Sequence, residues 1–306
     1  MLQSAQTKIY CLLLLAGLVS ACASAPSGPE VKFDESALRS EDQDLIFATE
    51  YPVANKADAL QRATEARNDG ELDKALFLYV KALKFDPHDA ELLARIGHTH
   101  QLQHNAPMAV RAFTLALQEK PDYVAVLEAR GLLYFTFKED ARAADDLSRA
   151  VELNGGSSSV HNALGLLADR SGDHDTAQQH YSSALELNPG AAEILNNRGY
   201  SKFMSGDYEG SGRDLYEAAH THGHKQAWVN LGAWYAHHGE YDLAIEALQN
   251  VLPGPEALNI VAEKSIQKGD YDTAEDLLQQ AIRLSPTYFP AAEENLAKLR
   301  FETAGS

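Results

Sequence analysis

Histidine is a common metal ligand, and the chain has twelve copies among 306 residues. His100 and His104 are four residues apart, a spacing that places both imidazoles on one face of a helix. A zinc site needs three or four His, Cys or carboxylate ligands, and no neighbouring residue completes such a set. We interpret these histidines as solvated or partly packed, and a metal-dependent enzyme that uses the histidine cluster is the alternative. The two histidine groups are His98, His100 and His104, and His220, His222 and His224.

Other catalytic patterns are missing from the sequence. It has no Gly-rich phosphate loop and no Ser-His-Asp or Cys-His arrangement. The two cysteines, Cys11 and Cys22, lie within or at the end of an apolar run, so neither suggests a disulfide or a metal site. We therefore predict that the chain is not an enzyme and that it uses no cofactor.

Asparagine offers a different chemistry, because its amide is both a donor and an acceptor and can match the backbone of an extended peptide. Asparagines recur about one repeat apart in the second half of the chain, and aromatic side chains beside them suit pockets for a partner's side chains. Alternatively, the amides satisfy groups between helices and the aromatics belong to the core. The candidate peptide-binding residues are Asn162, Asn196, Asn197, Tyr200, Phe203, Asn230 and Asn259.

Cys22 has a separate role as a lipid attachment site. A short start with Lys8 precedes the apolar run 9–19, which is too short to span a bilayer as a helix. The run ends in Val-Ser-Ala-Cys (19–22), which resembles a bacterial lipobox, whereas a conventional signal peptide would be cleaved near Ala23 or Ala25. We predict a signal peptide over 1–21 and acylation of Cys22. In related lipoproteins Asp after the cysteine retains the protein in the inner membrane, so Ala23 implies the outer membrane, facing the periplasm.

The charge of the chain limits its partners. Its 44 acidic and 26 basic residues give a net charge of −18. Such a surface repels phosphate backbones, so we do not expect nucleic acid as a partner. Residues 22–55 are rich in Pro, small residues and acids, and we expect a flexible tether, although 37–47 could dock as a short helix.

Small residues that recur at a fixed period predict the helices that carry these candidate side chains. Gly and Ala recur every 34 residues from residue 56 onward, which resembles the tetratricopeptide repeat, a pair of antiparallel helices whose backbones approach closely. Gly70, Gly172, Gly206, Gly239 and Gly269 are expected to end first helices. The residues that share the period are Ala75, Ala109, Ala143 and Ala177, then Gly97, Gly131, Gly165 and Gly199, then Ala82, Ala116, Ala150, Ala184 and Ala218.

We predict an all-α superhelix of about seven helix pairs over 56–301, closed by a capping helix at 289–301. Residues 302–306 are expected to form a disordered tail. A stack of this kind buries each repeat against its neighbours and needs a cap with a polar outer face. The first helices would line its concave side.

One repeat resembles a narrower family. The run Leu-Asn-Asn-Arg-Gly-Tyr-Ser (195–201) and the Ser-Gly-Asp turn (205–207) look like those of the TadD lipoproteins of Tad (Flp) pilus systems. The resemblance implies a membrane-anchored, pilotin-like scaffold whose partners are envelope proteins such as a secretin and pilus assembly factors. An adaptor for cell-wall hydrolases or proteases, as in the NlpI lipoproteins, is the alternative.

Overall fold

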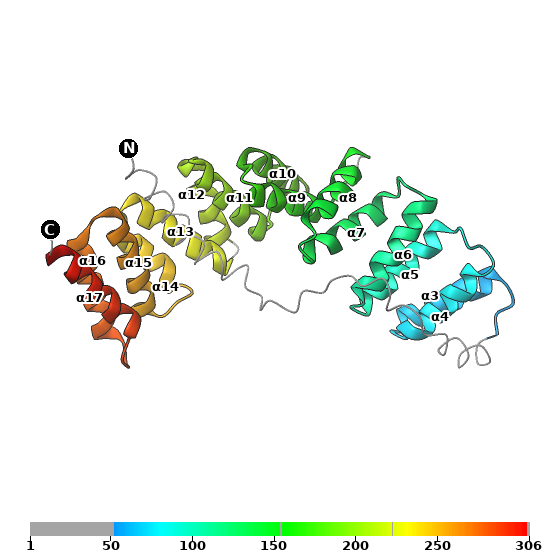
Figure 1. Ribbon diagram of the computed structural model, residues 1–306, viewed down its shortest axis with the longest axis horizontal. Helices are drawn as coiled ribbons and strands as arrows, with labels where there is room; N and C mark the ends of the chain where they lie inside the picture. Colours follow the sequence, from blue (N-terminus) through cyan, green and yellow to red (C-terminus); the bar gives the residue numbers. More distant parts are fainter. Residues whose placement is uncertain (1–51, 154, 222, 305–306) are drawn as a thin grey trace. The chain divides into compact units, whose positions relative to one another are not determined.

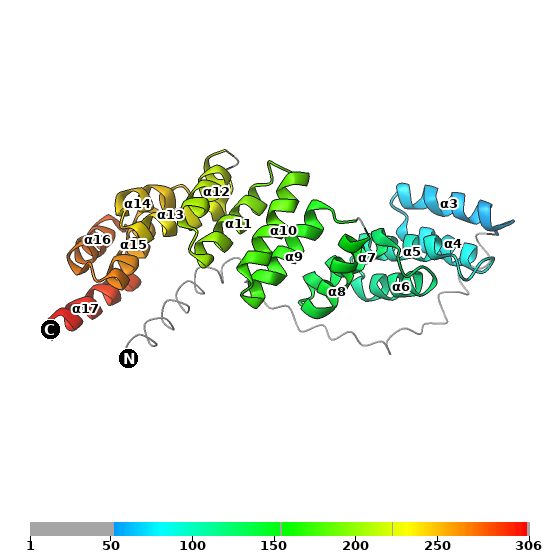
Figure 2. The same cartoon turned by 90° about the horizontal axis from the view of Figure 1, so that it is seen from above.

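The computed structural model describes residues 52–153, 155–221 and 223–304, and over these ranges the chain is helical with no strand (Figures 1 and 2). Cys22, the signal peptide and nearly all of the expected tether lie outside the described residues. In the described part, no helix combines the length and the apolar content needed to cross a bilayer.

The helices form two compact units, the first ending at Gly156 and the second beginning at Ser157. Each unit is a series of antiparallel helix pairs, and the second closes with a single helix. The first unit contains α3 (Lys56–Asn68), α4 (Leu72–Leu83), α5 (Ala90–Leu102), α6 (Ala106–Glu119), α7 (Val124–Thr136) and α8 (Asp140–Glu152). The second contains α9 (Ser158–Ser171), α10 (His174–Leu187), α11 (Ala192–Ser205), α12 (Tyr208–His220), α13 (Lys225–His238), α14 (Tyr241–Gln249), α15 (Gly254–Lys268), α16 (Tyr271–Leu284) and α17 (Pro290–Ala304). The expected seven pairs and closing helix are thus confirmed.

Close packing within each pair depends on the small residues. Ala75, Ala109 and Ala177 have no exposed surface. A Cβ atom on Gly165 would lie 2.5 Å from Cε1 of Tyr181, which is itself fully buried. Because interiors are as dense as organic crystals, no larger residue fits there without displacing the ring.

The turn between the two helices of a pair is left-handed. Gly172 and Gly206 have φ of 81° and 91°, where a residue without Cβ is favoured. His104 and Lys138 take the same place in the second and third pairs, with φ of 57° and 59°. The turn is therefore kept even where the sequence lacks glycine.

The last helix differs slightly from its expected bounds. Ala292, Leu296 and Leu299 of α17 are buried against the last pair. The helix continues to Ala304 rather than ending at 301, so residues 302–304 belong to it and not to a disordered tail. Within this additional turn the Thr303 hydroxyl donates to the carbonyl of Leu299 at 3.0 Å.

Candidate peptide-binding surface

Three successive first helices of the second unit carry a connected row of amides. The Asn197 Nδ2 on α11 donates to Oδ1 of Asn162 on α9 at 3.1 Å. The Asn230 Nδ2 on α13 donates to Oδ1 of Asn196 on α11 at 2.8 Å. In each bond the donor lies one repeat later in the chain than the acceptor. On α11, Asn197 therefore binds the preceding first helix, α9, and Asn196 binds the following one, α13. The row holds neighbouring first helices together.

A second amide group links the end of the unit. Asn295 on α17 donates to Oδ1 of Asn259 at 3.0 Å and to Oε1 of Glu263 at 2.9 Å. Asn259 in turn donates to Glu263 at 3.0 Å. Sequence reasoning missed Asn295, because the closing helix has no following repeat to set its register.

Burial divides the asparagines into two classes. Asn196 and Asn259 are only 5% and 6% exposed, so their amides face other helices. Asn162, Asn197 and Asn230 are half-buried. An amide has two N–H groups and two lone pairs, and each of these three retains hydrogen-bonding capacity beyond its bond in the row. The half-buried asparagines can therefore bind one another between helices and still offer hydrogen bonds to a partner.

The two predicted aromatic residues lie on α11 in different surroundings. Burial, with the nearby charge of Asp169, raises the pKa of the Tyr200 hydroxyl. The Phe203 ring stands edge-on to Tyr208 and His237, with centroids 5.4 and 5.1 Å away. Phe203 thus contributes to contacts between repeats, and Tyr200 lies nearer the asparagine row in the sequence and along the helix.

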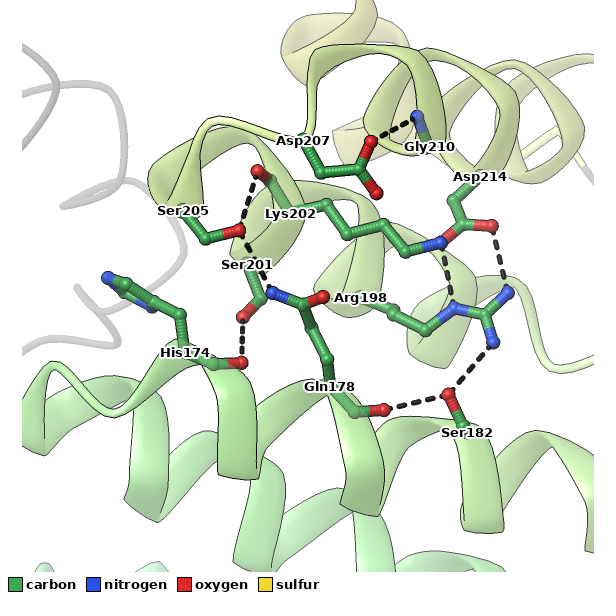
Figure 3. A network of polar contacts seen from close by, with 10 residues as sticks. All are labelled: His174, Gln178, Ser182, Arg198, Ser201, Lys202, Ser205, Asp207, Gly210 and Asp214. Carbon is green, nitrogen blue, oxygen red and sulfur yellow. Dashed lines mark hydrogen bonds and ion pairs between the residues drawn. The ribbon is translucent and has the colours of Figure 1, made fainter.

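A buried ion pair, which sequence reasoning missed, fixes the helix that carries this row (Figure 3). The Arg198 guanidinium on α11 donates twice to the Asp214 carboxylate on α12, both at 2.8 Å, and once to the Ser182 hydroxyl on α10 at 3.2 Å. Lys202 adds an ion pair to Asp214 at 2.8 Å. Asp214 is 5% exposed, so this bidentate pair sets the rotation of α11 against both neighbouring second helices.

The first unit repeats the same arrangement. Arg130 binds Asp146 through two bonds of 2.7 and 2.8 Å and reaches Thr114 at 3.0 Å. Burial opposes the charge of Arg130, but the hydrogen bonds and charge of Asp146 outweigh it, and the pKa of the guanidinium lies above its ordinary value. The signal was available in the sequence: Arg, Asp and a hydroxyl residue occupy equivalent positions two repeats apart.

A second polar cluster contains serine, histidine and aspartate but lacks catalytic geometry. Ser201 and His174 both bind Oδ1 of Asp169, at 2.7 and 2.9 Å, and Tyr181 binds its other oxygen at 2.8 Å. A catalytic triad instead requires the serine to donate to the histidine. Ser201 also has no exposed surface. The carboxylate here organises the junction of α9, α10 and α11.

The histidine groups do not form a metal site in the part of the chain that the structure describes. His100 lies on α5, which ends at Leu102, and His104 lies just beyond that end in the left-handed turn, so the two imidazoles do not share a helix face. His220 stacks on Tyr216 with centroids 3.8 Å apart, and His222 lies outside the described residues. The imidazoles of His161 and His180 also approach each other, with their Nδ1 atoms 3.3 Å apart.

Comparisons with known proteins agree with this architecture. Family models described as tetratricopeptide repeat match residues 162–222 and 256–288. The first match includes Asn162, Asn197 and Tyr200, and the second includes Asn259. Together with the helix pairs, these matches identify the fold as that of a tetratricopeptide-repeat protein.

Solved structures show the same fold at low sequence identity. A tetratricopeptide repeat protein from Parabacteroides merdae is 18% identical, over 80% of this chain and 98% of that chain, with a TM-score of 0.54. YrrB, a TPR protein with an unusual peptide-binding site, is 17% identical over 64% of this chain and 95% of that chain, with a TM-score of 0.52. The MamA protein is 24% identical over 54% of this chain and 90% of that chain, with a TM-score of 0.50.

Proposed function

We propose that this tetratricopeptide-repeat protein is a scaffold that binds an extended segment of a partner along the first helices of its second unit. The observation that carries the proposal is the amide row of α9, α11 and α13, whose half-buried members Asn162, Asn197 and Asn230 keep donors and acceptors for a peptide backbone. Tyr200 would supply a side-chain contact beside them. One structural neighbour, YrrB, has an unusual peptide-binding site, which fits the same general role.

The proposal extends to the location of the scaffold. The lipobox-like run ending at Cys22 supports acylation and an anchor in the outer membrane, with the repeats in the periplasm. The resemblance of 195–201 to TadD lipoproteins supports a pilotin-like role in assembling a Tad-type pilus or secretion apparatus. A secretin or a pilus assembly factor is the partner that this resemblance implies.

The anchor is tested by Cys22→Ser. Without the thiol there is no acyl chain, so we expect the variant to move from the membrane fraction to the soluble fraction or to remain unprocessed. Fractionation of the envelope after a high-salt wash measures this. A variant that still sediments with the outer membrane would show that the lipid is not the anchor.

The binding surface is tested by Asn197→Ala combined with Asn230→Ala. Each lost hydrogen bond costs about 0.5–1.5 kcal/mol of binding, so the double variant should bind its partner segment roughly tenfold more weakly. Adding Tyr200→Ala should weaken binding further. Calorimetric titration with the partner segment identified by cross-linking in the envelope measures the affinity.

A matched control separates binding from folding. Both substitutions also remove an amide–amide bond between helices, so some loss of stability is expected. Asn295→Ala also removes two hydrogen bonds between helices, to Asn259 and to Glu263, at the far end of the unit. It should lower stability similarly and leave affinity unchanged. Equal losses of affinity in the control and in the double variant would mean that the asparagines act only through the fold.

A further inference from the structure

The outer face of α4 carries an apolar and basic surface, which we call the α4 face: Phe77, Val80, Lys81, Lys84 and Phe85. The residues follow helical spacing, so they share one side of the helix and its end. Val80 is 38% exposed and Phe85 is 53% exposed. The Lys81 ammonium lies 5.1 Å from the centre of the Phe77 ring. Large apolar side chains and lysines therefore alternate on a solvent-facing surface.

Comparison with the next three repeats shows that two positions of this face, those of Phe77 and Val80, are unusual. The 34-residue period places polar or charged residues at the positions of Phe77 and Val80 in the next three second helices. The counterparts of Phe77 are Arg111, Asp145 and Gln179, and those of Val80 are Thr114, Ser148 and Ser182. Phe77 also packs partly against the core of the first pairs, so Val80 and Phe85, the exposed large apolar residues of α4 and its end, are the ones that need another explanation.

The charge of the α4 face is also opposite to that of the protein. The chain as a whole carries −18. Among the described residues, neither Lys81 nor Lys84 is in an ion pair, whereas Lys74, two turns before Lys81, pairs with Glu71. An acidic and apolar occupant would match the face in both respects.

The chain itself contains such a segment immediately before the first repeat. Residues 41–50 read Glu-Asp-Gln-Asp-Leu-Ile-Phe-Ala-Thr-Glu, with four acids, no base and three consecutive large apolar side chains. Covering an apolar, basic face would remove these three apolar side chains from water and bring the acids near opposite charges.

The described residues place this segment within reach. Lys56, at the start of α3, binds Asp86 just beyond the end of α4, at 2.7 Å, so the chain enters the repeat beside Phe85. The carbonyl of Pro52 accepts from Arg62 at 2.7 Å, which holds the entry point against α3. Ten residues can span about 33 Å, and the twelve residues of α4 are about 18 Å long.

We propose that residues 41–50 dock on the α4 face of the same chain. The side chains of Leu45, Ile46 and Phe47 cover Val80 and Phe85, and the flanking carboxylates pair with Lys81 and Lys84. Attachment through residues 51–55 raises the local concentration of the segment to the millimolar range, which favours it over an external ligand. The docked segment then fixes where the preceding chain leaves the first repeat.

Hydrogen exchange of the full chain tests the docking. In the unaltered protein, amides of 41–50 should exchange at least about tenfold more slowly than in an unstructured peptide. Lys81→Glu with Lys84→Glu should return them to within about twofold of the unstructured rate. Reversing the partners as well, with Glu41→Lys, Asp42→Lys and Asp44→Lys, should restore protection. Lys225→Glu with Lys298→Glu makes the same charge change on the second unit and should have no effect.

Other results would overturn the proposal. Unstructured exchange rates for 41–50 in the unaltered chain would exclude docking, as would protection that the α4 charge reversal leaves intact. Protection that disappears on dilution would assign the face to a second copy of the chain. Unprotected 41–50 together with binding to phosphatidylglycerol vesicles that needs Lys81 and Lys84 would assign it to a membrane surface. Unchanged exchange in α3 and α5 shows that each variant is folded.

Discussion

The buried pair of Arg198 and Asp214 allows a quantitative test of how α11 is held. The Asp214 carboxylate accepts two bonds from Arg198 and one from Lys202, all at 2.8 Å, and the residue is 5% exposed. Asp214→Ala would leave two largely buried cations without a carboxylate. Removing one partner of a buried pair costs about 3–5 kcal/mol, and we expect this loss of unfolding free energy for the single variant.

Replacing both partners should cost much less. The next repeat has Leu231 and Ala247 at these positions, 1% and 3% exposed, so the fold already accepts an apolar pair there. Buried ion pairs exchanged for apolar residues are often neutral in stability. We expect Arg198→Leu with Asp214→Ala to cost about 1–2 kcal/mol, the remainder coming from Lys202, and the double-mutant cycle to show a coupling of about 2 kcal/mol or more.

Urea unfolding followed by circular dichroism measures these differences. Arg149 and Asp122 provide the control, because they are also 2.8 Å apart but their side chains are 47% and 60% exposed. An exposed pair contributes about 0–1 kcal/mol, so the control cycle should show little coupling. If the double variant at 198 and 214 lost the full sum of the single effects, the ion pair would not act as a unit.

Two further predictions concern the turn and the histidines. His104→Gly should raise the unfolding free energy by about 1 kcal/mol, because a left-handed φ of 57° penalises any residue with a Cβ. The control His98→Gly, within α5, should lower the unfolding free energy. A lower unfolding free energy in both variants would contradict the turn assignment. Burial lowers the pKa of His100 and of His180, where the charge of His161 adds to the effect. The unfolded chain therefore binds these protons more tightly, so stability should be complete above the ordinary histidine pKa of about 6.5 and fall as the pH drops towards 5. In the His180→Gln variant the melting temperature should fall less steeply as the pH drops from about 6.5 towards 5. An unchanged slope of melting temperature against pH would show that His180 does not contribute to this pH dependence.

Much of the fold could be predicted from spacing, because a close helix contact tolerates only small residues. The period of Gly165 and Ala177 thus predicted the helix pairs, and Gly172 and Gly206 predicted the turns within them. His104 and Lys138 lie at the same 34-residue period as Gly70 and Gly172, so the period places their turns although the residue types do not indicate them.

The candidate surface was predictable only in part. Periodicity placed Asn162, Asn197 and Asn230 on successive first helices, but it could not tell that the amides bind one another, because Asn197 and Asn230 meet a partner one residue out of register. Asn295 had no repeat to mark it. The ion pairs of Arg130 and Arg198 do not follow the 34-residue period, because only alternate repeats carry them, and a search for residues shared by every repeat misses them.

The central claim is that a partner segment lies along the first helices of the second unit. Hydrogen exchange of the full chain, with and without the partner segment at saturating concentration, tests it most directly. We predict that binding slows exchange in α9, α11 and α13, with the largest change around Asn197 and Asn230, and leaves α10 and α12 nearly unchanged. Slower exchange confined to α10 and α12, with α11 and α13 unaffected, would contradict the claim.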